Sequence, residues 1–271
     1  MSSSLPPEIL DLIVDHLHDE PTTLRACCLV SKSWIPRTRM HLFNSVKFRL
    51  FGRSTLESWM QTFPDPSTSP AHYTRSLHLS HFKVITVAIS DARPWILSFS
   101  SIVDMRVITI GGDDRHLSFV QLHGLFPTLK SLRISYTFAP LSEVLDFVCS
   151  FPLLEDFSSY SVTFLDQENA DEWIAPPTSP KFTGSLLLSG SSRWITRKLL
   201  GLPGGLHFSK VRVLCPIGEG DSVNELVSTC SDTLKSLSVD FYRGAFFQLS
   251  VVDQYLIVPR RRTHGRYASF N

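Results

Sequence analysis

Two short polar clusters carry residue types that could bind a metal ion or transfer a proton. The first is Gly111-Gly-Asp-Asp-Arg-His116, which directly follows an expected strand. Paired carboxylates beside a histidine, here Asp113, Asp114 and His116, can ligate a metal or act as acid and base. Glycine and aspartate are also the usual residues of tight turns. We therefore expect a turn, with an enzyme that uses these three side chains as the alternative.

The second cluster, His16-Leu-His-Asp-Glu20, resembles a metal site by composition only. Adjacent positions of a helix point in different directions, so we expect a solvated helix end. The chain has no Gly-x-Ser-x-Gly elbow, no Gly-x-x-x-x-Gly-Lys phosphate loop and no Gly-x-Gly-x-x-Gly after a strand. The sequence therefore predicts a protein that is not an enzyme, with no catalytic residue, no metal and no cofactor.

Composition narrows the class of partner. The 271 residues include 26 basic and 25 acidic side chains, a formal net charge of +1, which argues against binding long nucleic acid by phosphate neutralisation. With 43% hydrophobic and 19% charged residues, the chain can bury a core. No apolar stretch approaches the ~20 residues of a membrane span, and the N-terminus lacks the features of a signal peptide. We expect neither nucleic acid nor membrane as a partner.

The cysteines indicate a reducing compartment. There are five, at 27, 28, 149, 215 and 230, and no Cys-x-x-Cys occurs, so neither a disulfide framework nor a zinc site is expected. This predicts a protein of the cytoplasm or nucleus. The run Arg260-Arg-Arg262 suggests a solvated tail, with nuclear import or RNA contact as the alternative.

The elements that would position any site begin with three expected helices. In the first, prolines and Glu8 suit the opening turn, and apolar residues recur every three or four positions from Ile9 to Leu17. Thr22-Thr23 is expected to cap the second helix, and a third is expected from about Ser33 to Leu42.

Three short helices bury little surface by themselves. Leu5, Pro6 and Ile9 are therefore candidates for an exposed apolar patch that binds a partner. The alternative is that the whole stripe packs inside the protein.

The strings LPPEILDLIVDHL, LRACCLVSKSW and RMHLF, in this order and spacing, closely resemble the F-box in the form common in fungal F-box proteins. The resemblance covers Leu5 to about Val46. F-box proteins are substrate receptors of cullin–RING ubiquitin ligases, and their F-box docks on a Skp-type adaptor. The resemblance implies that role here, with an unknown protein substrate. The residues that match the F-box positions, and so imply adaptor binding, are Leu5, Pro6, Ile9, Leu10, Ile13, Leu17, Val30 and Trp34.

After a helix at 53–63 and a linker at 64–70, one theme recurs: a short alternating strand preceded by a helical stretch. The clearest copies are Leu129-Lys-Ser-Leu-Arg-Ile134 and Leu234-Lys-Ser-Leu-Ser-Val239. Anchors at 77, 108, 132, 157, 186, 211 and 237 recur about every 27 residues, within the range of leucine-rich repeats. The intervening helical stretches are expected at 94–99, 117–126, 141–149, 194–200 and 223–230.

We therefore expect an α/β fold: a three-helix F-box at 4–50, a connecting helix and linker at 51–70, a degenerate leucine-rich-repeat-like solenoid with a parallel sheet at 71–245, and an irregular cap or tail at 246–271. An ordinary α/β domain with a parallel sheet is the alternative to the solenoid. Substrate is expected on the strand-lined face and strand-end loops, at residues such as His78, Asp113, Arg133 and Tyr136. The rival function is a scaffold that joins no ligase and whose F-box-like helices pack internally.

Overall fold

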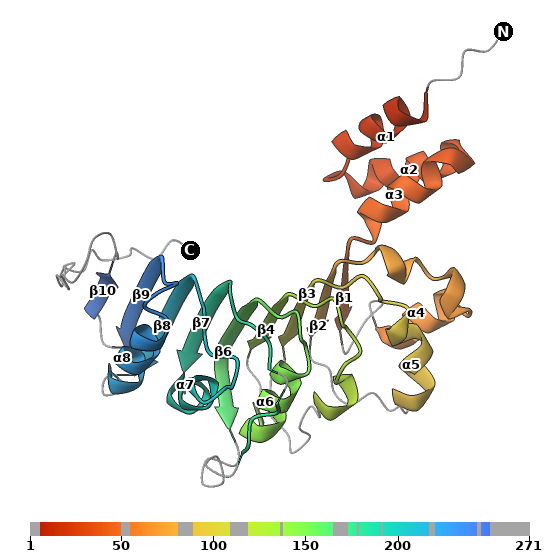
Figure 1. Ribbon diagram of the computed structural model, residues 1–271. Helices are drawn as coiled ribbons and strands as arrows, with labels where there is room; N and C mark the ends of the chain where they lie inside the picture. Colours follow the sequence, from red (N-terminus) through yellow and green to blue (C-terminus); the bar gives the residue numbers. More distant parts are fainter. Residues whose placement is uncertain are drawn as a thin grey trace, which may run out of the picture.

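The protein has an α/β fold in which one long, mostly parallel sheet is joined to three N-terminal helices (Figure 1). The computed structural model describes residues 6–49, 55–80, 89–108, 119–135, 138–164, 173–177, 179–190, 192–216, 220–242 and 245–249. None of the helices in these stretches is both long and apolar enough to cross a bilayer.

The strands are β1 (Ser45–Arg49), β2 (Ser76–Ser80), β3 (Asp104–Ile108), β4 (Ser131–Ser135), β5 (Phe138–Ala139), β6 (Asp156–Phe164), β7 (Ser185–Gly190), β8 (Lys210–Pro216), β9 (Ser236–Tyr242) and β10 (Ala245–Leu249). The α-helices are α1 (Pro7–His16), α2 (Pro21–Val30), α3 (Ile35–Leu42), α4 (Leu56–Thr62), α5 (Ile89–Leu97), α6 (Leu141–Cys149), α7 (Ser192–Leu200) and α8 (Gly220–Thr229). The 3-10 helices are η1 (Lys32–Trp34), η2 (Pro66–Thr68), η3 (Pro70–Tyr73) and η4 (Phe119–Leu122).

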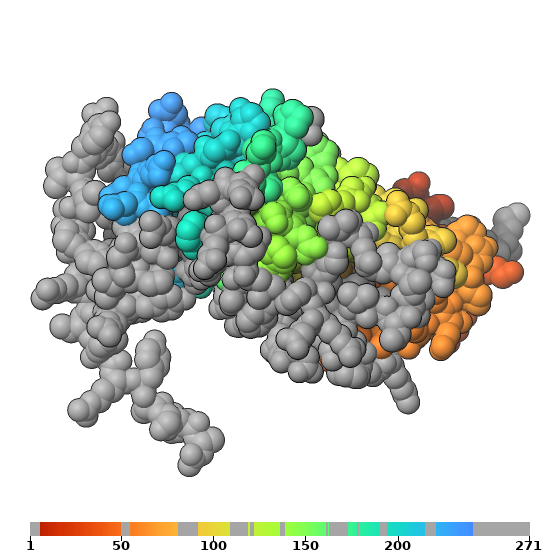
Figure 2. All heavy atoms as spheres, turned by 90° about the horizontal axis from the view of Figure 1, so that it is seen from below, coloured from red at the N-terminus to blue at the C-terminus, as the bar shows by residue number. Residues whose placement is uncertain are grey.

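Strands that follow one another in the sequence lie side by side in the sheet. The order is β1-β2-β3-β4-β6-β7-β8-β9-β10, with the short β5 paired to β6, and the pairs from β1 to β9 are parallel. β10 turns back and pairs antiparallel with β9. In Figure 2 the colours follow each other in sequence order along the molecule, from the orange of α4 to the blue of the last strands.

Alternating side chains decide which face of the sheet is buried. In β1 and β3 the second and fourth residues are buried and their neighbours are not, as period-two geometry requires; β4 follows the same pattern except that its last residue, Ser135, is buried as well. The buried set packs under the helices that cover one face of the sheet (Figure 1). The alternation was predicted, and it leaves the polar positions on the opposite face.

The buried anchors repeat in register, with one correction to the sequence prediction. Leu77 pairs with Met105 rather than with Ile108, and Met105 pairs with Leu132. Met105 is fully buried whereas Ile108 is only half-buried, so the anchor at 108 was three residues too late. With Met105 as the anchor, the spacings from Leu77 to Met105 and from Met105 to Leu132 are 28 and 27 residues. Both are closer to the average repeat of about 27 residues than the spacings that an anchor at 108 gives.

The turns that precede the strands are joined by a repeated backbone contact. The carbonyl of Asn44 accepts from the N–H groups of Arg75 and Ser76 at 2.9 and 3.0 Å. The carbonyl of Arg75 does the same for Val103 and Asp104. Equivalent pairs recur at the carbonyls of Val103, Lys130, Gly184 and Ser209. Each unit thus satisfies the backbone of the next, which a chain of stacked units requires.

Several predicted elements differ in detail. Helix α6 has the predicted bounds, but the described part of the stretch expected at 117–126 forms only the 3-10 helix η4, together with turns. Strand β1 was not predicted and extends the sheet into the 4–50 range. Thr22-Thr23 does not cap α2: the helix starts at Pro21 after Glu20, and the Thr23 hydroxyl donates to the Glu20 carboxylate at 2.9 Å.

Candidate functional site

Apolar side chains are exposed on the two N-terminal helices that α3 supports. On α1 they occupy positions three and four apart, so they share one helix face. On α2 they are the last two residues, and Leu29 is 89% and Val30 70% exposed. We call this set the N-terminal apolar patch, and its members are Ile9, Leu12, Ile13, Leu29 and Val30.

The opposite sides of these helices form a small core. Val14, Leu24 and Cys27 are buried. Thr38 of α3 is fully buried, and its hydroxyl donates to the Trp34 carbonyl at 2.7 Å. Helices α1 and α2 both contact α3 and η1, so these two elements hold the helices that carry the patch. The patch is therefore what remains after the unit has buried the rest of its apolar surface.

The adaptor-binding residues predicted from the sequence divide into three groups. Pro6, Ile9, Ile13 and Val30 are exposed. Leu10, Leu17 and Trp34 are half-buried, and Leu5 lies outside the described residues. Sequence reasoning missed Leu12 and Leu29, although the position of Leu12 three residues after Ile9 could have signalled it.

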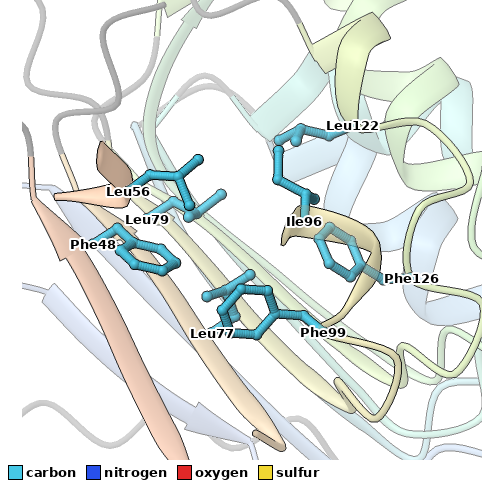
Figure 3. A pocket seen from close by; sticks show the side chains of 8 residues that line it. All are labelled: Phe48, Leu56, Leu77, Leu79, Ile96, Phe99, Leu122 and Phe126. Carbon is cyan, nitrogen blue, oxygen red and sulfur yellow. The ribbon is translucent and has the colours of Figure 1, made fainter. Parts of the chain in front are cut away.

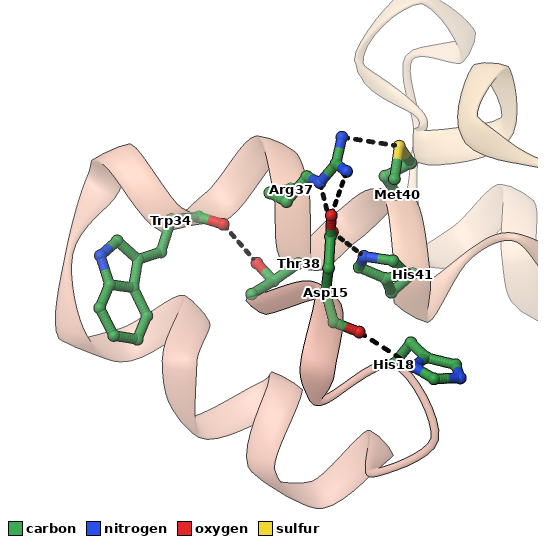
Figure 4. A network of polar contacts seen from close by, with 7 residues as sticks. All are labelled: Asp15, His18, Trp34, Arg37, Thr38, Met40 and His41. Carbon is green, nitrogen blue, oxygen red and sulfur yellow. Dashed lines mark hydrogen bonds and ion pairs between the residues drawn. The ribbon is translucent and has the colours of Figure 1, made fainter. Parts of the chain in front are cut away.

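A polar network ties α1 to α3 (Figure 4). Arg37 donates to Asp15 from Nε at 2.6 Å and from Nη2 at 2.5 Å, and His41 Nε2 lies 2.7 Å from Asp15 Oδ1. These hydrogen bonds and the nearby positive charge hold the pKa of Asp15 well below its ordinary value of 3.8. An aspartate beside a histidine resembles an acid–base pair, but here Arg37 engages both carboxylate oxygens and the network fastens two helices.

Several of the polar residues singled out in the sequence lie outside the described residues. Asp113, Asp114, His116 and Tyr136 lie outside them, as does the Arg260-Arg-Arg262 run. Within the stretches that the structure covers, no three His, Cys, Asp or Glu side chains gather as a metal site. In the His16–Glu20 segment, His18 pairs with its neighbour Asp19 at 3.0 Å on the surface.

A cavity between the sheet and its helices is walled by hydrocarbon alone (Figure 3). Its lining is Phe48, Leu56, Leu77, Leu79, Ile96, Phe99, Leu122 and Phe126. Such a wall offers neither a proton donor nor an anchor for a polar substrate. Elsewhere in the core, burial raises the pKa of the Cys149 thiol to about 12, so it stays protonated at neutral pH.

The substrate-binding residues predicted on the sheet lie on its helix-free face. His78 of β2 and Arg133 of β4 occupy the same row across the strands, because each pairs with Arg106 of β3. Lys47 of β1 pairs with His78 and extends the row. Sequence reasoning missed Lys47 and Arg106, because β1 was not predicted and the anchor of β3 was placed three residues too late.

No family model matches the chain, and a search of the curated proteins likewise finds no match.

Proposed function

We propose that this protein is a substrate receptor of a cullin–RING ubiquitin ligase. Residues 4–50 act as an F-box that docks on a Skp-type adaptor, and the sheet with its helices acts as a leucine-rich-repeat-like solenoid that presents a protein substrate. The F-box resemblance of the sequence and the exposure of the N-terminal apolar patch support the first part. The register of the sheet supports the second.

The patch is the observation that carries the proposal. Leu29 and Val30 end a helix with most of their surface in water, and three apolar residues of α1 are exposed with them. Burial of an exposed aliphatic side chain is worth on the order of 1.5–3 kcal/mol. A partner that covers all five therefore gains substantial binding energy, and exposed apolar surface is typical of protein docking sites.

The solenoid part of the proposal rests on repetition. Buried anchors pair in register from Leu77 to Leu237 at steps of 25 to 29 residues. The same turn contact recurs before six strands. Such regular register is typical of stacked repeats, in which each unit buries its apolar edges only against its neighbours. In the part of the chain that the structure describes, the helices cover one face of this sheet and leave the other open to a partner (Figure 1).

In this function the chain performs no bond chemistry. It holds a substrate near the ubiquitin-loaded carrier and so raises the local concentration of the target lysines. The geometry that matters is therefore the connection between the docking helices and the sheet. Helix α3 contacts η3, and β1 follows α3 within three residues, so the two parts are joined closely.

Co-expression with a Skp-type adaptor tests the proposal. The full chain is expected to elute with the adaptor as a 1:1 complex on size exclusion with light scattering. Ile9→Ser/Ile13→Ser is expected to elute apart from it, while Leu153→Ser, which changes an exposed leucine outside the patch, co-elutes like the wild type. A wild-type chain that elutes as a monomer beside free adaptor would favour the scaffold alternative.

A further inference from the structure

Four cationic or ionisable side chains stand side by side on the helix-free face of the sheet. Parallel register pairs Lys47 with His78, His78 with Arg106, and Arg106 with Arg133. Neighbouring strands lie ~4.8 Å apart, so the four positions form a line about 14 Å long. We call this line the basic row.

The basic row is unusual in having its charges left unpaired. Like charges on adjacent strands repel, so such a line costs stability unless something compensates it. Beyond the basic row, on the same face of the sheet, the positive charge of Arg212 of β8 is paired, because its Nη2 lies 3.2 Å from the carboxylate of Asp240 of β9. Among the described residues, no carboxylate lies within ion-pair distance of Lys47, Arg106 or Arg133.

His78 is partly buried among the charges of the row. Its pKa lies below the ordinary value, first because of burial and then because of Arg106, Lys47 and Arg133, with Asp104 acting in the opposite direction. Asp104, which accepts a hydrogen bond from Ser76 at 2.8 Å, keeps its negative charge. Three cations against this one carboxylate leave the potential on this part of the sheet positive.

We propose that the basic row binds an extended acidic segment of a protein, with anionic side chains at alternate positions. Side chains on one side of an extended chain recur every ~6.6 Å, so three of them span about the length of the row. Five residues with carboxylates or phosphates at the first, third and fifth positions therefore match it. That this segment belongs to the substrate rests on the proposed receptor function.

The surroundings favour a short peptide over a nucleic acid. The chain as a whole carries a net charge of only +1. The row ends at β4, where Ser158 of β6 is the next partner of Arg133. Asp156, also on β6, would repel a phosphate backbone that continued past the row.

Fluorescence anisotropy on the full chain tests the proposal. The probe is a labelled peptide with alternating glutamate and serine that carries three glutamates. A second peptide has glutamine in place of glutamate, and a third has phosphoserine there. At low salt we expect the glutamate or the phosphoserine peptide to bind at least tenfold tighter than the glutamine peptide. Whichever binds tighter identifies the source of the negative charge.

Two charge-matched variants give the control. Arg106→Gln/Arg133→Gln is expected to lose at least tenfold in affinity, while Lys210→Gln/Arg212→Gln, which removes two charges from the same face at β8, stays within twofold. The melting temperature of the row variant is expected to equal or exceed that of the wild type, because repulsion is relieved. Equal losses in both variants, no preference for the anionic peptides, or tighter row-dependent binding of an oligouridylate would each overturn the proposal.

Adaptor binding is measured separately on the same proteins. The row variant is expected to bind the adaptor normally, and Leu29→Ser is expected to bind the acidic peptide normally. Failure of the peptide to bind and failure of the adaptor to bind are therefore distinguishable.

Discussion

Asp15 of α1 and Arg37 of α3 are joined by two hydrogen bonds, at 2.6 and 2.5 Å. The two residues are 22 positions apart in the sequence, so the pair connects two separate helices. His41, one turn further along α3, contacts the same carboxylate. The pair fastens α1 to α3, while Ile9, Leu12 and Ile13 of α1 stay exposed. Paired arginine and carboxylate groups of this geometry are among the more specific polar contacts in proteins.

Asp15→Asn is expected to loosen α1 and α3. Because the carboxylate is one-third exposed and screened by solvent, the loss is about 1 kcal/mol, or about fivefold faster local opening. Hydrogen exchange of the full chain, followed by mass spectrometry of peptides from α1 and α3, measures it. Asp11→Asn is the control, since Asp11 lies on the same helix and acts on Arg37 only through longer-range attraction.

The same pair predicts a pH dependence. The pKa of Asp15 is lowered in the folded protein, so its contribution is complete above the ordinary value of 3.8 and decreases as the pH falls below it. The difference in stability between wild type and Asp15→Asn is therefore expected to shrink as the pH falls below about 4. Thermal melting at matched pH values from 7 to 3 measures this difference. A constant difference over the whole range would contradict the role given to the carboxylate.

The two faces of β4 are expected to respond differently to substitution. Leu132 is buried in the sheet core, so Leu132→Ala is expected to cost about 3 kcal/mol of unfolding free energy. Ser131→Ala, one residue earlier on the opposite face, is expected to change it by less than about 0.5 kcal/mol. Urea unfolding followed by tryptophan fluorescence compares them. Similar losses in the two variants would contradict the assigned register.

Gly184 is required by a close approach rather than by its backbone angle. A Cβ there would lie 2.3 Å from Asp156 Oδ1 and 3.1 Å from the Glu155 carbonyl oxygen. The Asp156 carboxylate accepts from the backbone N–H and the hydroxyl of Ser185, at 2.5 and 2.6 Å. The carboxylate cannot move away without losing these bonds.

Gly184→Ala is therefore expected to cost about 1–3 kcal/mol, and Asp156→Ala about 1–2 kcal/mol. The double variant is expected to cost less than the sum, because the new methyl group no longer meets the carboxylate. Urea unfolding of the three variants measures the coupling. Strictly additive costs would show that the Cβ and the carboxylate do not compete.

Much of the sheet could be predicted because its signal is local. Alternation around Leu132 and Leu237 and the helical spacing of α6 are each contained in one short segment. β1 could not be predicted in this way, because Val46 and Phe48 are two apolar residues directly after a helix and acquire a strand only by pairing with β2. Two of the four residues of the basic row, His78 and Arg133, could be predicted. Lys47 and Arg106 could not, because their place in the row depends on the register between strands.

The N-terminal unit shows the same division. Periodicity predicted the stripe on α1, but exposure depends on how α1 and α2 lie against α3. Leu29 looked like one apolar residue among several in LRACCLV, and only the packed helices show that it faces water. The Asp15 network joins residues 22 and 26 positions apart, beyond the reach of any local pattern.

The most direct test of the central claim is a calorimetric titration of a Skp-type adaptor into the full chain. Leu29→Ser is compared with Ile174→Ser, because Leu29 and Ile174 are exposed to nearly the same extent, 89% and 87%, and only Leu29 belongs to the N-terminal apolar patch. We predict saturable 1:1 binding by the wild type, unchanged affinity for Ile174→Ser and a loss of about tenfold or more for Leu29→Ser. Absence of binding by the wild type, or equal affinity of the two variants, would contradict the proposed docking surface.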